Sequence, residues 1–409
     1  MADVLGEVIA RSRAGERAAI PSVCSAHPEV IEASLRLACA RGRALVVEAT
    51  SNQVNQEGGY TGQRPREFVG MVHGLAKRAG LDREALVLGG DHLGPQAWRH
   101  LPAEEAMRRA EEMVRAYVAA GFTKVHLDCS EGCAGESPQL PDEVTVPRAR
   151  ALAEAAGDRS LLLVVGTEVP PPGGARQGEH GPEPTRPEAA RRTLDAHVAA
   201  LGHLGRIGGL VVQPGVEFGA LSVDRLPLGR DPGLREAVAH VPGVVLEAHS
   251  TDYQDPEALP RLAELGFAFQ KVGPALTFAW REAVYALDSL ARVAGWSRGE
   301  GVPEVMERLM LAEPGRWERH LDPGADLRMQ RHFAYADRVR YLWPHGEAQA
   351  ALARLEASLG DLPEPMLRQG FSDDVLDLAE GLSAEGLPRP AALRQAKVQA
   401  ALLPYLFAP

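Results

Sequence analysis

Eight short apolar segments recur along the chain up to residue 272, and they constrain its fold more than any other feature. They are rich in Val and Leu and occupy residues 18–23, 44–49, 85–90, 124–128, 161–166, 209–213, 243–248 and 267–272. Continuous apolar runs of this length are typical of strands that are buried on both faces of a parallel sheet. The sequence therefore predicts a parallel sheet with covered faces.

Segments with helical periodicity lie between these runs, and several begin with proline and end at glycine, as helices often do. They span residues 28–42, 65–80, 102–121, 187–205 and 256–266. Strand–helix alternation repeated eight times predicts a closed (β/α)8 TIM barrel. No GxGxxG motif follows the first run, which disfavours a dinucleotide-binding sheet.

The pattern changes near residue 300, where the apolar runs stop and only helical segments follow. These segments span residues 302–321, 326–343, 347–360 and 390–406. We therefore expect a barrel over residues 1–298 and an α-helical C-terminal extension over residues 299–409.

Composition limits the partners of this 409-residue chain. Its net charge of −11 leaves no basic surface for nucleic acid or an anionic membrane. The chain has four cysteines and no CxxC pair, which favours a reducing, cytoplasmic setting. Neither a signal peptide nor an apolar run long enough to cross a membrane is visible.

The residues that follow the predicted strands are polar, and several are able to bind metal. A barrel enzyme carries its active site at these C-terminal strand ends. We expect His92, Glu168 and His249 to bind one divalent cation, either Zn²⁺, Mn²⁺, Ni²⁺ or Co²⁺, with Asp128 as an optional fourth ligand. Such a cation would polarise a ketose carbonyl.

Three carboxylates at the strand ends are candidates for proton transfer. Asp91 directly precedes His92 and is the expected base, with Asp128 or Glu48 as the opposing acid. Asp128 shares a face with His126 if the fourth strand is regular. The alternative for Asp91 is a structural role in capping the turn that follows.

Two groups of residues are candidates for substrate binding. Asn52, Asn55 and Gln213 are placed to contact sugar hydroxyls, although Asx-turn chemistry is the alternative for the asparagines. The second group follows the last two strands, where barrels often bind phosphate, and it comprises Ser250, Thr251, Lys271 and Gly273. A Schiff base is a second option for the lysine.

Residues 168–187 are rich in proline and glycine and follow the fifth strand. They are either a solvated loop or a mobile lid over the site.

Nine motifs resemble one known family over essentially the whole chain. They are CSAHP (24–28), EATSNQVNQEGGYTG (48–62), GGDHLGP (89–95), GFTKVHLDCS (121–130), GTEVPPPGG (166–174), VVQPGVEF (211–218), EAHSTDYQ (247–254), KVGPALTFAWREA (271–283) and DRVRYLWPH (337–345). They are similar to the GatZ/KbaZ family, the Z-type subunits of D-tagatose-1,6-bisphosphate aldolase, also labelled tagatose-6-phosphate kinase. The resemblance implies a TIM barrel related to the metal-dependent class II aldolases, with a place in galactitol, tagatose or amino-sugar catabolism.

The class II aldolase pattern carries over in part. The resemblance implies proton transfer by Asp91 and metal binding by His92 and His249. The middle metal-binding histidine of the aldolases lies in a GTxHG-type turn, where this chain has GTEVP, so Glu168 would have to replace it.

Three functions follow from the residues and the resemblance together. The first is a metal-dependent enzyme acting on ketohexose phosphates, either by C4 epimerisation between fructose 6-phosphate and tagatose 6-phosphate or by retro-aldol chemistry. The second is a non-catalytic subunit that stabilises a separate aldolase chain. The third is a tagatose-6-phosphate kinase, which the lack of a GxxxxGK[ST] motif disfavours. Besides the ketose phosphate, an aldolase catalytic subunit and further copies of this chain are candidate partners.

Overall fold

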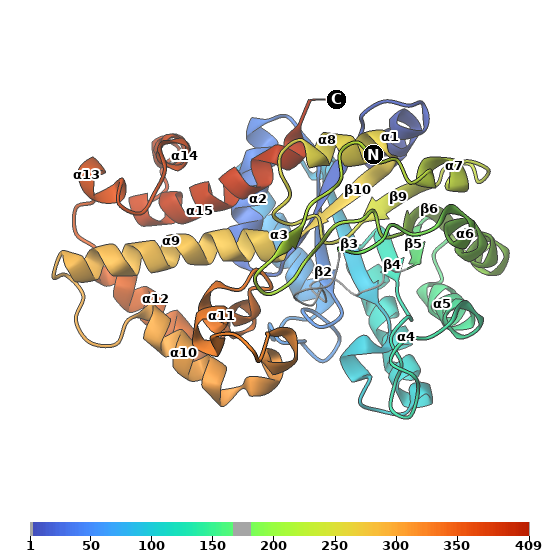
Figure 1. The fold of residues 1–409 in the computed structure, drawn as a ribbon, viewed down its shortest axis with the longest axis horizontal. Coiled ribbons are helices and arrows are strands. Elements are labelled where there is room, and N and C mark those ends of the chain that lie inside the picture. The colour runs from blue at the N-terminus through green and yellow to red at the C-terminus, as the bar shows by residue number, and fades with distance from the viewer. Residues whose placement is uncertain (1–2, 167–180, 409) are drawn as a thin grey trace.

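The computed structural model describes residues 3–166 and 181–408, and at its centre eight parallel strands form a closed barrel (Figure 1). The predicted TIM barrel is confirmed, and each predicted run overlaps a strand. The strands are β1 (Ile20–Cys24), β2 (Leu45–Thr50), β3 (Leu86–Leu93), β4 (Lys124–Leu127), β5 (Leu162–Gly166), β6 (Arg206–Val211), β9 (Val245–Ala248) and β10 (Phe267–Val272). The barrel closes where β1 pairs with both β2 and β10.

Helices surround the barrel and follow the proline and glycine signals closely. Those covering the strands are α2 (Pro28–Ala40), α3 (Pro65–Ala79), α4 (Ala103–Ala120), α5 (Asp142–Ala156), α6 (Pro187–Leu201), α7 (Leu234–Val238), α8 (Ala258–Glu264) and α9 (Pro274–Val293). Gly80 and Gly121 adopt left-handed backbone conformations (φ 73° and 101°) that end α3 and α4. Helix α5 was not expected from the sequence, because Pro147 interrupts its helical pattern.

The N-terminal helix α1 (Val4–Arg13) closes the end of the barrel where the strands begin. Leu5 and Ile9 on its apolar face are buried in one cluster with the barrel residues Val46, Val164 and Phe269. Because α1 covers this end, the opposite end, where the strands finish, is the accessible one.

An antiparallel pair of short strands, β7 (Glu217–Phe218) and β8 (Val223–Asp224), follows β6. This pair lies outside the barrel and was not expected from the sequence. Short 3₁₀ turns also flank β3, namely η1 (Arg83–Ala85) and η2 (Pro95–Trp98).

The C-terminal extension is helical, and from residue 299 to residue 408 it contains no strand. Its helices are α10 (Val302–Ala312), α11 (Leu327–Phe333), α12 (Gly346–Ser358), α13 (Glu364–Leu367), α14 (Asp373–Ala384) and α15 (Arg389–Leu402). Its 3₁₀ turns are η3 (Pro314–Arg316), η4 (Glu318–His320), η5 (Arg338–Leu342) and η6 (Leu403–Leu406). Helix α15 runs beside α9 and packs on α9 and α2 (Figure 1). The division at residues 298 and 299 stays a prediction.

None of the described helices has the length and apolar character needed to cross a membrane.

Candidate active site

A layer of charged side chains fills the interior of the barrel. The Lys124 ammonium lies 2.6 Å from Glu48 Oε1 and 2.6 Å from Glu247 Oε2, and all three side chains are fully buried. Burial alone would lower the pKa of Lys124, but the two carboxylates raise it above its usual value. The barrel interior is therefore held together by ionised groups that compensate one another.

A second buried ammonium, that of Lys271 on β10, lies closer to the open end. It forms an ion pair with Asp91, and its Nζ lies 3.1 Å from Glu247 Oε1 and 3.5 Å from Glu48 Oε2. Burial would raise the pKa of Asp91, but the charges of His92 and Lys271 hold it well below its usual value. Three carboxylates thus face two ammonium groups and, above them, the His92 ring.

Three histidine rings converge above this layer, from β3, β4 and just beyond β9. The ring centroid of His92 lies 4.9 Å from that of His126 and 4.9 Å from that of His249, and the other two rings lie 5.3 Å apart. His126 Nε2 lies 3.0 Å from the Gly166 carbonyl oxygen, and its Nδ1 accepts from the His92 backbone N–H at 3.4 Å. His92 Nδ1 lies 2.8 Å from Asp91 Oδ1. The His92 ring therefore has one nitrogen fixed by a neighbour, the usual arrangement around metal-binding histidines, whereas both nitrogens of His126 have a neighbour within hydrogen-bonding distance.

The backbone around the histidines is strained. His92 and Ser250 have positive φ angles of 47° and 52°, a conformation that residues other than glycine rarely adopt. Gly94 is required nearby, because a Cβ at this position would lie 1.7 Å from the Asp128 carbonyl oxygen. Such strain concentrates at functional sites, where the surrounding structure enforces it.

The donor set fits a divalent cation. Donor atoms of Asp91, His92 and His126 lie within 4.8 Å of one another, and so do those of His126, Glu247 and His249. Imidazole nitrogens with carboxylate oxygens suit Zn²⁺, Mn²⁺, Ni²⁺ and Co²⁺. The predicted ligands His92 and His249 are thus brought together, whereas Glu168 lies outside the described residues.

The sequence-based analysis missed His126 as a metal-ligand candidate, together with Lys124 and Glu247 of the buried layer. The signal was present, because side chains on a strand alternate between its faces. Lys124 and His126 occupy the inward positions of β4, and Glu247 precedes His249 by two residues. Asp128 is buried just past β4, where its Oδ2 accepts from Gln96 Nε2 at 3.0 Å.

The predicted sugar-binding amides have different surroundings. Asn52 is exposed and lines the cavity above the histidines. Asn55 instead holds its own loop, since its Oδ1 accepts from the backbone N–H groups of Glu57 and Gly59 at 2.9 and 3.0 Å. Gln213 likewise uses its Oε1 to accept from two backbone N–H groups of the following turn.

The donors of the predicted phosphate site are engaged within the protein. Lys271 faces three carboxylates, and the Thr251 hydroxyl donates to the Lys271 carbonyl oxygen at 2.6 Å. The Gly273 N–H donates to Asp252 Oδ1 at 3.0 Å, and Ser250 Oγ lies 3.2 Å from Glu217 Oε2. Ser250, Lys271 and Gly273 lie on the wall of the cavity described next, but these contacts already occupy their donors, and the anion site stays a prediction.

A cavity of about 300 Å³ opens above the histidines. Asp91, His92, Asp128 and Lys271 lie on its wall, together with residues from the C-terminal extension that sequence analysis did not single out: His320, Arg338, Arg340 and Tyr341. The volume is within the range of small-molecule sites. The extension therefore contributes to the same cavity as the barrel.

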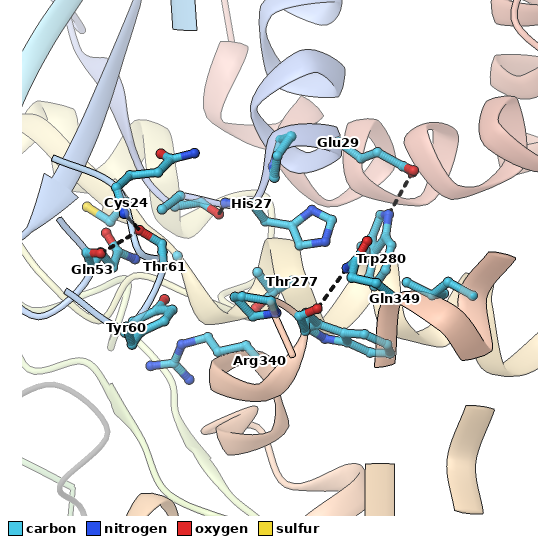
Figure 2. Close-up of a pocket in the computed structure, with 18 residues that line it drawn as sticks. Cys24, His27, Glu29, Gln53, Tyr60, Thr61, Thr277, Trp280, Arg340 and Gln349 are labelled. Carbon is cyan, nitrogen blue, oxygen red and sulfur yellow. Dashed lines mark hydrogen bonds between the residues drawn. The ribbon is translucent and has the colours of Figure 1, made fainter. Parts of the chain in front are cut away.

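A second cavity, of about 320 Å³, adjoins the first and is shown in Figure 2. The His27 ring packs on Trp280 with a centroid distance of 4.2 Å, and burial lowers the pKa of His27 to about 4. Tyr60 and Arg340 line both cavities, and Figure 2 shows them side by side below Thr61 and Gln53.

Known proteins similar to this chain include a curated relative and a solved structure. The chain is 45% identical over 407 residues to a D-tagatose 6-phosphate 4-epimerase from Agrobacterium fabrum, with 94% of this chain and 95% of that protein covered. It also superimposes with a TM-score of 0.83, at 44% identity, on the crystal structure of a probable tagatose 6 phosphate kinase from Sinorhizobium meliloti 1021, covering 95% of this chain and 99% of that one.

A family profile matches residues 5–409, and its description is D-tagatose-1,6-bisphosphate aldolase subunit GatZ/KbaZ-like. This match spans nearly the whole chain and includes both the barrel and the extension. The chain therefore belongs to the GatZ/KbaZ-like family.

Proposed function

We propose that the protein is a divalent-metal-dependent sugar-phosphate 4-epimerase that interconverts fructose 6-phosphate and tagatose 6-phosphate. The observation that carries this proposal is the cavity in which Asp91, His92, Asp128 and Lys271 meet at the strand ends. The 45% identity to a D-tagatose 6-phosphate 4-epimerase supports the same reaction.

The chemistry of the substrate indicates how C4 is inverted. In a 2-ketohexose the C4 hydroxyl is β to the C2 carbonyl, so the C3–C4 bond is an aldol bond. A base takes the C4 hydroxyl proton, the C3–C4 bond breaks, and its electron pair moves to the C2 carbonyl oxygen. The aldehyde fragment rotates so that C3 attacks the opposite face of the aldehyde carbon. The new C4 alkoxide then takes a proton.

Asp91 is the proposed base. It lies on the cavity wall beside His92, and its pKa is held well below the usual value, so it is ionised at neutral pH, as a base must be. Lys271 and His126 contact its Oδ1 and fix its orientation. These contacts support a role in proton transfer rather than a structural turn.

Asp128 is the proposed opposing group. It shares the cavity wall with Asp91, whereas Glu48 is fully buried against Lys124 beneath the cavity. Of the two carboxylates expected from the sequence, Asp128 is therefore the better placed to return a proton to the substrate.

His92, His126 and His249 are the proposed ligands of the metal ion, and Glu168 remains a proposed ligand from the sequence. A bound divalent cation supplies Lewis acidity at the sugar carbonyl oxygen. Asn52 is the proposed contact to the sugar hydroxyls, since it lines the cavity.

A non-catalytic role is the second candidate function, because the family description is that of an aldolase subunit. In that case the chain would assemble with an aldolase catalytic subunit. The kinase name of the related crystal structure has less support, since the chain lacks a GxxxxGK[ST] motif.

The test uses the purified chain without any other protein. Fructose 6-phosphate, tagatose 6-phosphate and tagatose 1,6-bisphosphate are each incubated with it, with and without Zn²⁺, Mn²⁺, Ni²⁺ or Co²⁺, and the products are followed by NMR. We expect metal-dependent interconversion of the two 6-phosphates. Absence of conversion with every metal would favour the subunit function, and ATP turnover with tagatose 6-phosphate would favour the kinase.

The thiols support a reducing compartment. All four cysteines lie in the described part of the chain, and all are free. We propose a cytoplasmic location on this ground.

A further inference from the structure

Two arginines of the extension face the cavity. Arg338 and Arg340 lie on the turn η5 and line the same cavity as Asp91 and His92. Among the described residues, no carboxylate forms an ion pair with either guanidinium. Their bonds go to backbone carbonyls and to the Tyr341 hydroxyl, which accepts from Arg338 at 3.1 Å and from Arg340 at 2.9 Å.

The pKa values of two neighbouring side chains are shifted in the direction that positive charge at this end of the cavity causes. Burial, followed by the charges of Arg338 and Arg340, lowers the pKa of His320 to about 4. Burial would raise the pKa of Tyr341, but the same two charges outweigh it and lower the pKa below its usual value. Both shifts have the sign expected for an excess of positive charge.

The turn that carries the arginines is fixed to the barrel. Asp337, directly before it, is buried with a positive φ of 43°, and its Oδ1 accepts from Arg281 Nε at 2.8 Å. Its Oδ2 accepts from the Thr277 hydroxyl at 2.7 Å. Both partners lie on α9, which follows β10, so the barrel sets the position of the two arginines.

The cavity is therefore polarised. Its barrel wall carries Asp91 and Asp128, whereas its extension wall carries two guanidiniums that form no ion pair with a carboxylate of the described residues. Guanidinium groups bind phosphate oxygens through pairs of charge-assisted hydrogen bonds. A ligand with one phosphate end and one hydroxyl-rich end matches this arrangement.

We propose that Arg338 and Arg340 bind the phosphate monoester of the substrate and thereby direct its ketose chain toward Asp91 and His92. This inference deepens the proposed function and rests on it for the sugar end alone. The phosphate then binds at the extension and not at the ends of β9 and β10, where the sequence predicted it. The extension thereby selects phosphorylated sugars.

Calorimetric titration of the metal-loaded protein tests the assignment without requiring turnover. The probes are fructose 6-phosphate, inorganic phosphate and free fructose, and the variants are Arg338→Gln, Arg340→Gln and the conservative Arg340→Lys. Arg308→Gln is the matched control, since this arginine lies on α10 in the same extension and pairs with Glu300 and Glu347 at the surface. Lys271→Met tests the competing phosphate site.

We expect each Arg→Gln variant to weaken fructose 6-phosphate binding about 10- to 100-fold, as for the loss of hydrogen bonds to a charged group, and inorganic phosphate binding similarly. Fructose binding stays within twofold in both variants, and Arg308→Gln matches the wild type. Arg340→Lys retains part of the phosphate affinity. Melting curves confirm that each variant is folded.

Equal weakening of fructose 6-phosphate and fructose would overturn the assignment, as would loss of phosphate binding in Lys271→Met alone. The proposed function is judged separately. If phosphate binding depends on the two arginines but the protein does not invert C4, the phosphate site stands and the epimerase proposal fails.

Discussion

At the residue scale, the most important interactions are those between the buried ions inside the barrel. Lys124 forms two 2.6 Å contacts with carboxylates in a place that water does not reach. Removing one member of such a cluster leaves buried charges without compensation, which costs far more than loss of a surface pair. The same cluster orients Lys271 and, through it, Asp91.

Lys124→Met is therefore expected to lower the free energy of unfolding by about 3–5 kcal/mol. Adding Glu48→Gln to it should recover part of that loss, because one of the uncompensated charges is then removed. Urea unfolding of the single and double variants measures the coupling. Lys77→Met is the control, since Lys77 is exposed on α3, and it should change stability by less than about 0.5 kcal/mol.

Asp91→Asn isolates the proton-transfer step. The amide keeps the shape of the side chain but cannot accept a proton, so kcat should fall about 10²–10⁴-fold. Bound metal, measured by mass spectrometry, should remain at the wild-type level. Near-normal turnover would exclude Asp91 as the base, and loss of metal together with activity would make it a ligand. Asp195→Asn, at an exposed surface pair with His240, should leave both unchanged.

At the element scale, three strand ends bring the histidines together, and one 3₁₀ turn brings in the arginines. The eight strands could be predicted because each is a continuous apolar run between glycine, proline or polar residues. Helix α5 could not, because Pro147 breaks its pattern. His92 and His249 were predicted from their positions after strands, whereas His126 lies within β4 and is recognised only when strand alternation is applied to Lys124 and His126 together.

Long-range contacts explain why the proposed phosphate ligands could not be predicted. The sequence shows that Lys271 follows a strand, but not that Asp91, Glu48 and Glu247 surround its ammonium. Equally, Arg338 and Arg340 lie in a segment that reads only as a helix, and their approach to the barrel depends on the contacts of Asp337 with α9.

Asp337→Asn should loosen the η5 turn without removing a group from the cavity wall. We expect a loss of about 3 kcal/mol or more in stability, since the buried Arg281 loses its counter-charge. The KM for fructose 6-phosphate should rise while that for fructose stays unchanged. Steady-state kinetics on both sugars provides the measurement.

Asp288→Asn serves as the matched control for this variant. Asp288 is also a buried carboxylate on α9, but it lines neither cavity of the candidate site; it pairs with Arg292 and accepts from the Val302 N–H. It should lower stability but leave both KM values unchanged. A rise in the fructose 6-phosphate KM of the Asp288 variant would show that general loosening, rather than the anchoring of η5, causes the effect.

At the scale of the whole molecule, barrel and extension enclose the cavities together, and a half-buried histidine between them links stability to pH. His27 precedes α2 and packs on Trp280 of α9 (Figure 2). The Trp280 ring in turn lies 4.8 Å from the ring of Trp343 in the extension. Its folded pKa is lowered to about 4 from 6.5, so the unfolded chain binds more protons between these two values. Stability should therefore fall as the pH drops from 6.5 to 4.

His27→Phe should remove this part of the pH dependence while keeping an aromatic ring against Trp280. Between pH 7 and pH 5 the wild type should lose at most about 2 kcal/mol more stability than the variant, because only the wild type has this histidine to protonate on unfolding. Urea unfolding at pH 7 and pH 5 measures it. His203→Phe, at an exposed position, should retain the wild-type pH dependence. Identical pH profiles for His27→Phe and the wild type would contradict the assignment.

The central claim is that this chain alone inverts C4 of a ketohexose 6-phosphate by breaking and re-forming the C3–C4 bond. In that reaction the hydrogen on C4 stays on the aldehyde carbon throughout, whereas direct proton removal at C4 would exchange it with solvent. The decisive measurement is NMR of the product formed from fructose 6-phosphate by the metal-loaded protein in D₂O. The account predicts tagatose 6-phosphate with hydrogen retained at C4. Deuterium at C4, or no tagatose 6-phosphate at all, would contradict it.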